Sequence, residues 1–295
     1  MDAGDYVLPV DKPEGPTSHD VVAMARKALG TRKIGHTGTL DPFASGLLVL
    51  CVGRATRLAE YLTGLEKSYV ARARLGVTTD TLDREGDVVE ERDGWQDLTR
   101  KRIEEGLSAF VGEVRQVPPQ FSAKKVGGEA MHRKARRGET VALDPVPVTI
   151  HSMELLAVEL PDITFAVRCS TGTYVRALAR DVGQRLGVGA HLTELRRTRV
   201  GAFSVDDALT VEDLEDADRV ASARIVPADA MSHLPRVELD DAGAARIRHG
   251  QRVPVPAASL PGAAIGAVIA VLDDDLVAVA RLEDGVLRPS KVFPA

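Results

Sequence analysis

The spacing of apolar residues predicts alternating helices and strands along most of the chain. Between residues 18 and 29 apolar side chains recur at helical spacing, with Ser18 as a candidate N-cap and Gly30 as the stop. The run LLVLCV at 47–52 is continuous and lies between two glycines, which is typical of a strand buried on both faces. The pattern therefore predicts a central sheet with helices packed against it.

Further strands and helices follow the same two periodicities. From 67 to 76 the alternation places Tyr69 among small apolar side chains on one face, and residues 163–169 alternate in the same way. Helical spacing marks residues 103–110 and 175–186. Strands and helices of these lengths are expected to bury one common core.

Two polar segments interrupt the regular pattern. Residues 116–141 combine proline and glycine pairs with a basic cluster and little apolar periodicity, which indicates an inserted, mobile segment. Residues 206–232 are acidic and irregular. Beyond them come a helical stretch and β-like runs separated by Asp273-Asp274-Asp275 and by Asp284-Gly285, which are turn signals. We therefore place a domain boundary at about residue 233.

Composition indicates an ordinary globular protein. The chain has 295 residues, of which 44% are hydrophobic and 27% charged. Its start lacks the basic and apolar regions of a secretory signal, and its longest apolar stretch, 262–272, is shorter than the ~20 residues that span a bilayer. The two cysteines, Cys51 and Cys169, lie in apolar runs and are expected to be buried thiols. We expect a cytosolic protein without a zinc site.

The distribution of charge matters more than its sum. A net charge of -5 and a pI near 5.9 are unusual for a protein that binds nucleic acid. However, basic residues gather between Arg115 and Arg137, whereas residues 206–218 are strongly acidic. Such segregation permits a local footprint for RNA phosphates.

One loop concentrates residues that can carry chemistry. Residues 33–46, KIGHTGTLDPFASG, contain three glycines that allow a close approach of backbone to ligand, and Pro42 biases Asp41 toward an extended or turn conformation. By itself the loop could be a plain turn in which Asp41 binds nearby amides. The spacing fits neither a phosphate-binding GxxxxGK[ST] loop nor an EF-hand.

Three segments, in this order and with these separations, resemble the signature blocks of the TruB family of pseudouridine synthases. They are Lys12 to Ser18 (KPEGPTS), Gly35 to Pro42 (GHTGTLDP) and Gly172 to Arg176 (GTYVR). The resemblance continues through Leu195-Arg196-Arg197 and, less clearly, to Pro289 to Phe293. It covers nearly the whole chain.

The resemblance implies an isomerase that converts uridine 55 in the T-loop of tRNA to pseudouridine without a metal or an organic cofactor. Asp41 would be the catalytic carboxylate, acting as a nucleophile or as the base that starts an elimination. The family match assigns contacts with the catalytic acid or the target base to five further residues: His36, Tyr69, Tyr174, Arg176 and Leu195. The residues alone, without the family match, favour a plainer interpretation: Tyr69 and Leu195 as core, Arg176 as a solvated helix residue, and His36 as a brace for its own loop.

The resemblance also implies an architecture. We expect an α+β fold with a mixed, largely antiparallel central sheet, in which residues 1–232 form the catalytic domain and 233–295 a small PUA-like β domain that binds RNA. Residues 115–141 would be a thumb that folds over the T-loop, and its basic side chains would contact RNA phosphates: Lys124, Lys125, Arg133 and Arg136. The alternative for this segment is a solvated charged loop.

Three functions remain to be weighed. The first is a monomeric tRNA pseudouridine synthase that needs no protein partner. The second is a non-catalytic protein that binds or folds tRNA on the same scaffold; it has no need of Asp41, whose charge would weaken contact with phosphates. The third, an enzyme that uses Asp41 as a phosphoryl acceptor, lacks the second aspartate that a metal would require.

Overall fold

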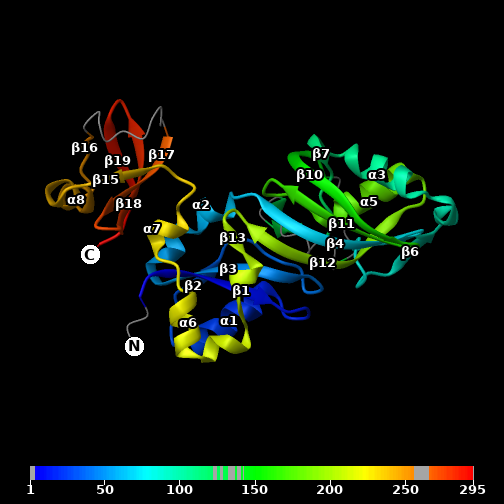
Figure 1. The fold of residues 1–295 in the computed structure, drawn as a ribbon, viewed down its shortest axis with the longest axis horizontal. Helices are drawn as coiled ribbons and strands as arrows, with labels where there is room; N and C mark the ends of the chain where they lie inside the picture. The colour runs from blue at the N-terminus through cyan, green and yellow to red at the C-terminus, as the bar shows by residue number, and fades with distance from the viewer. Residues whose placement is uncertain are drawn as a thin grey trace.

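A ten-stranded mixed sheet is the main feature of the computed structural model, which describes residues 4–121, 125, 126, 129–131, 137, 141, 143–255 and 266–294 (Figure 1). Eight strands follow one path across it: β14 (Leu209–Thr210), β1 (Tyr6–Lys12), β3 (Ser45–Val52), β12 (Ala190–Val200), β4 (Lys67–Leu75), β11 (Asp162–Cys169), β10 (Val146–Glu159) and β7 (Gly112–Gln116). Two short strands lie off this path, β2 (Ile34–His36) paired with β3 and β13 (Phe203–Ser204) paired with β12. Among the described pairs of this sheet, only β1–β14 and β12–β3 are parallel. The predicted mixed, largely antiparallel sheet is confirmed.

Strand β12 joins the two halves of the sheet. It pairs with β4 over most of its length and with β3 only through Arg196↔Ser45 and Arg197↔Gly46. Gly46 has a φ of +102°, and a Cβ there would lie 2.2 Å from the carbonyl oxygen of Arg197. A side chain is therefore incompatible with this close contact between β3 and β12.

Helix α1 (Ser18–Ala28) covers one face of the β1–β3 half. Its buried residues Val21, Val22 and Ala25 pack into a cluster with apolar side chains of both strands. Thr17, not Ser18, caps the helix, because the Thr17 hydroxyl accepts from the backbone of Asp20 and the Asp20 carboxylate accepts from that of Thr17. The predicted cap was therefore wrong by one residue.

Helices α3 (Arg100–Ser108) and α5 (Val175–Leu186) cover one face of the other half. Their apolar sides share a core with the alternating inward residues of β4, β11 and β12. The opposite face of these strands carries ion pairs such as Arg74 with Asp162. Burial on one face explains the clean alternation of β4 and β11.

A five-stranded sheet forms a small C-terminal β domain. Its order is β15 (Arg236–Glu238), β17 (Gly266–Leu272), β18 (Asp275–Glu283), β19 (Val286–Val292) and β16 (Val253–Pro254), and helix α8 (Asp241–Arg248) packs on one face. Asp273, Asp274, Asp284 and Gly285 all have positive φ, as tight hairpin turns require. The turns predicted from the sequence are therefore confirmed.

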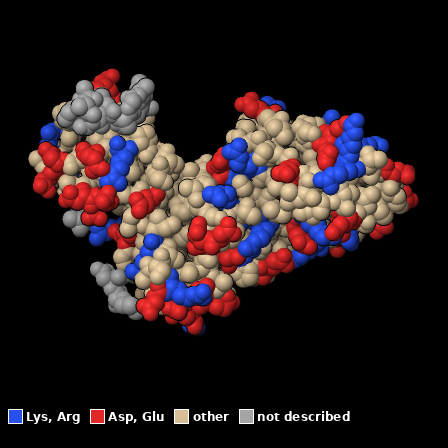
Figure 2. Space-filling model, viewed as in Figure 1, with Lys and Arg blue, Asp and Glu red and all other residues tan. Residues whose placement is uncertain are grey.

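The second face of the C-terminal sheet packs against the large sheet's domain. Ile269, Val279 and Phe293 share one buried cluster with Leu58 and Leu62, which belong to η1 (Gly53–Leu58) and α2 (Ala59–Thr63). Figure 2 shows a broad hollow between the C-terminal domain and the end of the large sheet that carries β7 and β10, with acidic and basic side chains interspersed on this face.

Several short elements complete the fold. They are β5 (Val77–Thr79), β6 (Val88–Glu91), η2 (Trp95–Asp97), β8 (Lys125–Val126), β9 (Glu129–Ala130), η3 (Val205–Asp207), η4 (Glu212–Glu215), α6 (Ala217–Ala223) and α7 (Pro227–Ala230). Residues 206–232, expected to be irregular, thus form short helices and the edge strand β14. Among the described residues, no helix is long and apolar enough to cross a membrane.

Candidate active site

The Asp41 loop links β2 to β3 and is held by side chains from outside it. Ser18 at the start of α1 accepts a hydrogen bond from the backbone N–H of Leu40 (2.8 Å) and donates to the Leu40 carbonyl (3.2 Å). The buried ammonium of Lys12 donates to the carbonyls of Pro13, Pro16 and Pro42. Asp41 is thereby fixed between two anchored neighbours.

Arg176, on the first turn of α5, holds Asp41 and a second carboxylate together. Its Nε lies 2.9 Å from Asp41 Oδ2, and its Nη1 lies 3.2 Å from Asp83 Oδ2. The guanidinium also donates to the carbonyls of Thr81 (2.7 Å) and Phe121 (2.9 Å). The Arg176 side chain is 5% exposed and that of Asp41 37%, so the arginine is fixed while the aspartate stays accessible.

Asp83 was not singled out from the sequence. It is buried, and its Oδ1 accepts from the Thr81 hydroxyl (2.6 Å) and the backbone of Glu85 (3.0 Å). These local hydrogen bonds are those of an ordinary turn. Only the tertiary contact with Arg176 indicates that Asp83 belongs to the site. Its spacing from Asp41 in the sequence carries no signal.

Opposing influences set the protonation of Asp41. Burial raises the pKa of its carboxyl group above the ordinary value, and the nearby charge of Asp83 acts in the same direction. The charge and hydrogen bond of Arg176 oppose this rise, as does the charge of Lys12. Arg176 therefore favours the charged form of Asp41, against the effect of burial.

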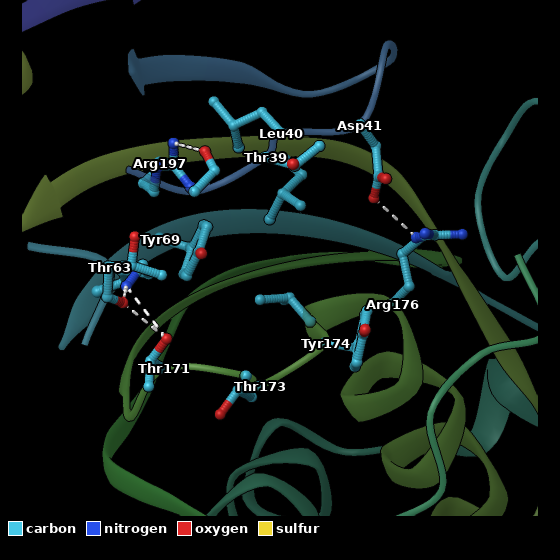
Figure 3. A pocket seen from close by; sticks show the side chains of 15 residues that line it. Thr39, Leu40, Asp41, Thr63, Tyr69, Thr171, Thr173, Tyr174, Arg176 and Arg197 are labelled. Atoms are coloured by element: carbon cyan, nitrogen blue, oxygen red, sulfur yellow. Dashed lines mark hydrogen bonds and ion pairs between the residues drawn. The ribbon is translucent and has the colours of Figure 1, made fainter. Parts of the chain in front are cut away.

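Asp41 opens onto a cavity of about 250 Å³ that lies between its own β2–β3 loop, strands β4 and β12, and the start of α5. The predicted site residues Asp41, Tyr69, Tyr174, Arg176 and Leu195 all line it. Figure 3 shows Asp41 and Arg176 at one end and Tyr69 with Arg197 at the other. Further lining residues are Gly38, Thr39, Leu40, Thr63, Lys67, Thr171, Gly172, Thr173, Val175 and Arg197.

His36 is the predicted site residue that the structure does not place in the lining of this cavity. Its Nδ1 accepts from the backbone N–H of Gly38 (3.2 Å), and its ring meets that of His19 edge-on at 5.4 Å. Burial and the neighbouring His19 lower the pKa of His36. In this structure His36 supports its own loop.

The end of the cavity beyond Tyr69 is lined by two buried cations that were not singled out from the sequence. Lys67 donates to the carbonyls of Thr63 (2.9 Å) and Leu65 (2.6 Å). Arg197 donates to the carbonyls of Leu47 (2.7 Å) and Gly38 (3.0 Å). Each lies two residues from a predicted site residue on the same strand, so the alternation of strands could have indicated them.

The predicted thumb is described only in part. Its short strands β8 and β9 pair as a two-stranded sheet. Lys125 lies in β8, with its side chain outside what the structure describes, and Lys124, Arg133 and Arg136 lie outside the described residues.

Comparison with solved structures defines the class of protein. A Cbf5-Nop10-Gar1 complex contains a chain that is similar with a TM-score of 0.77 and 30% identity, over 98% of this chain and 85% of that chain. A structure of an H/ACA RNP bound to a substrate RNA containing 2′-deoxyuridine matches with the same values. The fold is that of the pseudouridine synthases.

Sequence comparison narrows the class to one family. The TruB family pseudouridylate synthase N-terminal domain matches residues 26–175, the tRNA pseudouridylate synthase B C-terminal domain matches 176–237, and the pseudouridine synthase II TruB C-terminal model matches 235–293. The chain belongs to the TruB family and is a pseudouridine synthase. It is similar to proteins named tRNA pseudouridine synthase B from Burkholderia lata, 47% identical over 98% of this chain and 90% of the relative, and from a Mycobacterium species, 45% identical over 98% and 95%.

Proposed function

We propose that this enzyme converts uridine 55 in the T-loop of tRNA to pseudouridine, with the Asp41 carboxylate starting the reaction. The observation that carries the proposal is the accessible carboxylate of Asp41, ion-paired with buried Arg176 at the mouth of a cavity lined by two tyrosines. The relatives named tRNA pseudouridine synthase B supply the substrate class.

The chemistry requires one carboxylate and a pocket that retains the detached base. The N1–C1′ bond of the uridine must break, the uracil must turn while held, and a C5–C1′ bond must form. Asp41 either attacks C1′ or removes the proton from C2′. Tyr69 and Leu195 flank the space beyond Asp41, where a planar ring can stack.

A uridine inside the folded tRNA elbow must first be flipped out, which costs a few kcal/mol in unstacking. Contacts elsewhere have to offset that cost. We assign them to the basic thumb, residues 115–141, and to the C-terminal domain, residues 233–295, while residues 1–232 carry the chemistry. The enzyme is proposed to act as a monomer without a protein partner.

The alternative, a tRNA-binding or tRNA-folding protein without catalysis, leaves part of the site unexplained. A carboxylate exposed toward RNA phosphates weakens binding, and buried Arg176, which also pairs with Asp83, holds the Asp41 carboxylate at a cavity. A binding surface requires neither feature.

Mapping the modified position tests the proposal. An unmodified tRNA transcript is incubated with the enzyme, and pseudouridine is located by carbodiimide labelling and primer extension. We expect one strong stop at position 55 and none in a transcript with cytidine there. Modification at other uridines, with position 55 untouched, would refute the assigned substrate position.

A further inference from the structure

Lys67 and Arg197 are buried cations without a carboxylate partner at the end of the cavity opposite Asp41. Their residues are 6% and 2% exposed. Among the described residues, no carboxylate oxygen lies within 4.0 Å of either charged group. Figure 3 shows Arg197 beside Tyr69, across the cavity from the Asp41–Arg176 pair. One end of the cavity therefore has paired charges and the other has only positive charge.

Such an arrangement is costly in the folded protein. Buried charges are normally paired, because the loss of hydration is offset only by an opposite charge or by several hydrogen bonds. Lys67 and Arg197 have backbone carbonyls as partners, which satisfy their donors but not their charge. Burial and the charge of Arg197 lower the pKa of Lys67 to about 8, so the lysine remains mostly charged at pH 7. A function that brings negative charge into the cavity would explain both cations.

The proposed reaction generates negative charge at this end of the cavity. Because Asp41 acts on the ribose, the ribose must lie at the Asp41 end and the base must extend toward Tyr69. When the N1–C1′ bond breaks, its electron pair stays on the uracil ring, and C1′ is joined either to an Asp41 oxygen or to C2′ by a double bond. An electron pair of the turned ring then forms the C5–C1′ bond. In the same step the Asp41 oxygen leaves C1′, or Asp41 returns its proton to C2′. Finally C5 loses its proton and N1 gains one.

We propose that Lys67 and Arg197 stabilise the uracil anion while it is detached from the ribose. This inference rests on the proposed function. Fixed charges in a site shielded from water act strongly on charge that develops in the transition state and need no reorganisation at that moment. Lys67 has two carbonyl partners and a long contact of 3.5 Å with the Thr171 hydroxyl, so it acts through its charge. Arg197 also influences the buried hydroxyl of Tyr69, whose pKa burial raises and Arg197 lowers.

A change of leaving group separates this role from a structural one. Single-turnover rates at pH 7 are measured for wild type and Lys67→Met on a tRNA transcript with uridine at the target position and on one with 5-fluorouridine there. The rate is followed as loss of the original nucleoside from digests. Fluorine withdraws electrons and makes uracil a better leaving group, so its anion depends less on the lysine. We expect Lys67→Met to slow the uridine substrate about 100-fold and the 5-fluorouridine substrate about tenfold or less.

Lys12→Met is the matched control. Lys12 is equally buried and binds only backbone carbonyls, but it does not line the cavity, so its loss should slow both substrates by the same factor. Lys67→Gln, which retains donors for the Thr63 and Leu65 carbonyls, replaces Lys67→Met if the latter does not fold. Equal slowing of both substrates by a folded Lys67 variant would overturn the proposal. A wild-type enzyme that makes no pseudouridine from the uridine transcript would overturn the proposed function as well.

Discussion

Replacement of Arg176 by glutamine should move the acid limb of the pH–rate profile to higher pH. The substitution removes the 2.9 Å ion pair with Asp41 and the 3.2 Å pair with Asp83, so the charge of Asp83, which raises the pKa of Asp41, is no longer opposed by Arg176. An arginine beside an aspartate lowers its pKa by about 1–3 units, and each unit corresponds to about 1.4 kcal/mol. The pKa of Asp41, already raised by burial, should therefore rise further in the variant.

The sign of the effect follows from the form that reacts. In the proposed mechanism Asp41 must be charged, so we expect activity to be lost as the pH falls through its pKa in the folded enzyme. Raising that pKa shifts the loss toward neutral pH, with the largest deficit at the acid end. Single-turnover pseudouridine formation from pH 5 to 9, at saturating enzyme, measures the limb directly. Removing one partner of a buried pair also costs about 3–5 kcal/mol of stability, so a thermal unfolding curve must show that the variant is folded at the assay temperature.

Arg180→Gln is the matched control for this experiment. Arg180 lies one turn further along α5, its side chain is 27% exposed, and it pairs with Asp181 and the Val117 carbonyl outside the cavity lining. Its removal should leave the acid limb at the wild-type pH. An unshifted limb in folded Arg176→Gln would refute the idea that Arg176 keeps Asp41 charged.

Three further outcomes are expected. Tyr69→Ala should reduce the single-turnover rate far more than tRNA affinity, and a wild-type rate would remove Tyr69 from the site. Gly46→Ala, whose Cβ would meet the Arg197 carbonyl, should lower the free energy of unfolding, measured in urea, by at least about 2 kcal/mol. The control is Gly30→Ala, where φ is positive but the space is open, and it should cost about 1–2 kcal/mol. Alanine should replace the four thumb cations together: Lys124, Lys125, Arg133 and Arg136. This change should weaken tRNA binding and reduce the slope of log affinity against log salt concentration by up to about 3. An unchanged slope would contradict the thumb assignment.

Local features of the fold were predictable from the sequence because local physics determines them. The buried run of β3, the alternation in β4 and β11, and the hairpin turns around Asp273 and Asp284 each depend on neighbouring residues. The position of β12 between β3 and β4 depends on pairings between distant segments, which no local pattern encodes. Short helices such as α6 escaped prediction because a seven-residue segment has too few turns for a clear periodicity.

The site residues differ in the same way, because some have a signal in the sequence and others are defined only by contacts in space. Asp41 and Arg176 could be named because they fall in sequence blocks that resemble a family, and the structure places them 2.9 Å apart. Asp83 is defined only by what it contacts in space and looks ordinary in the sequence, whereas Lys67 could have been inferred from its place two residues before Tyr69 on β4. Ser18 was expected to cap its helix, yet its hydroxyl instead anchors Leu40 next to Asp41.

Pseudouridine formation by wild type and Asp41→Asn, with tRNA affinity measured in parallel, tests the central claim most directly. The substitution retains the size of the side chain and removes the charge that the proposed chemistry needs. We expect product from the wild type alone, with tRNA bound by both proteins. Product from Asp41→Asn at the wild-type rate, or none from a wild type that binds tRNA tightly, would contradict the assignment of Asp41 as the catalytic carboxylate.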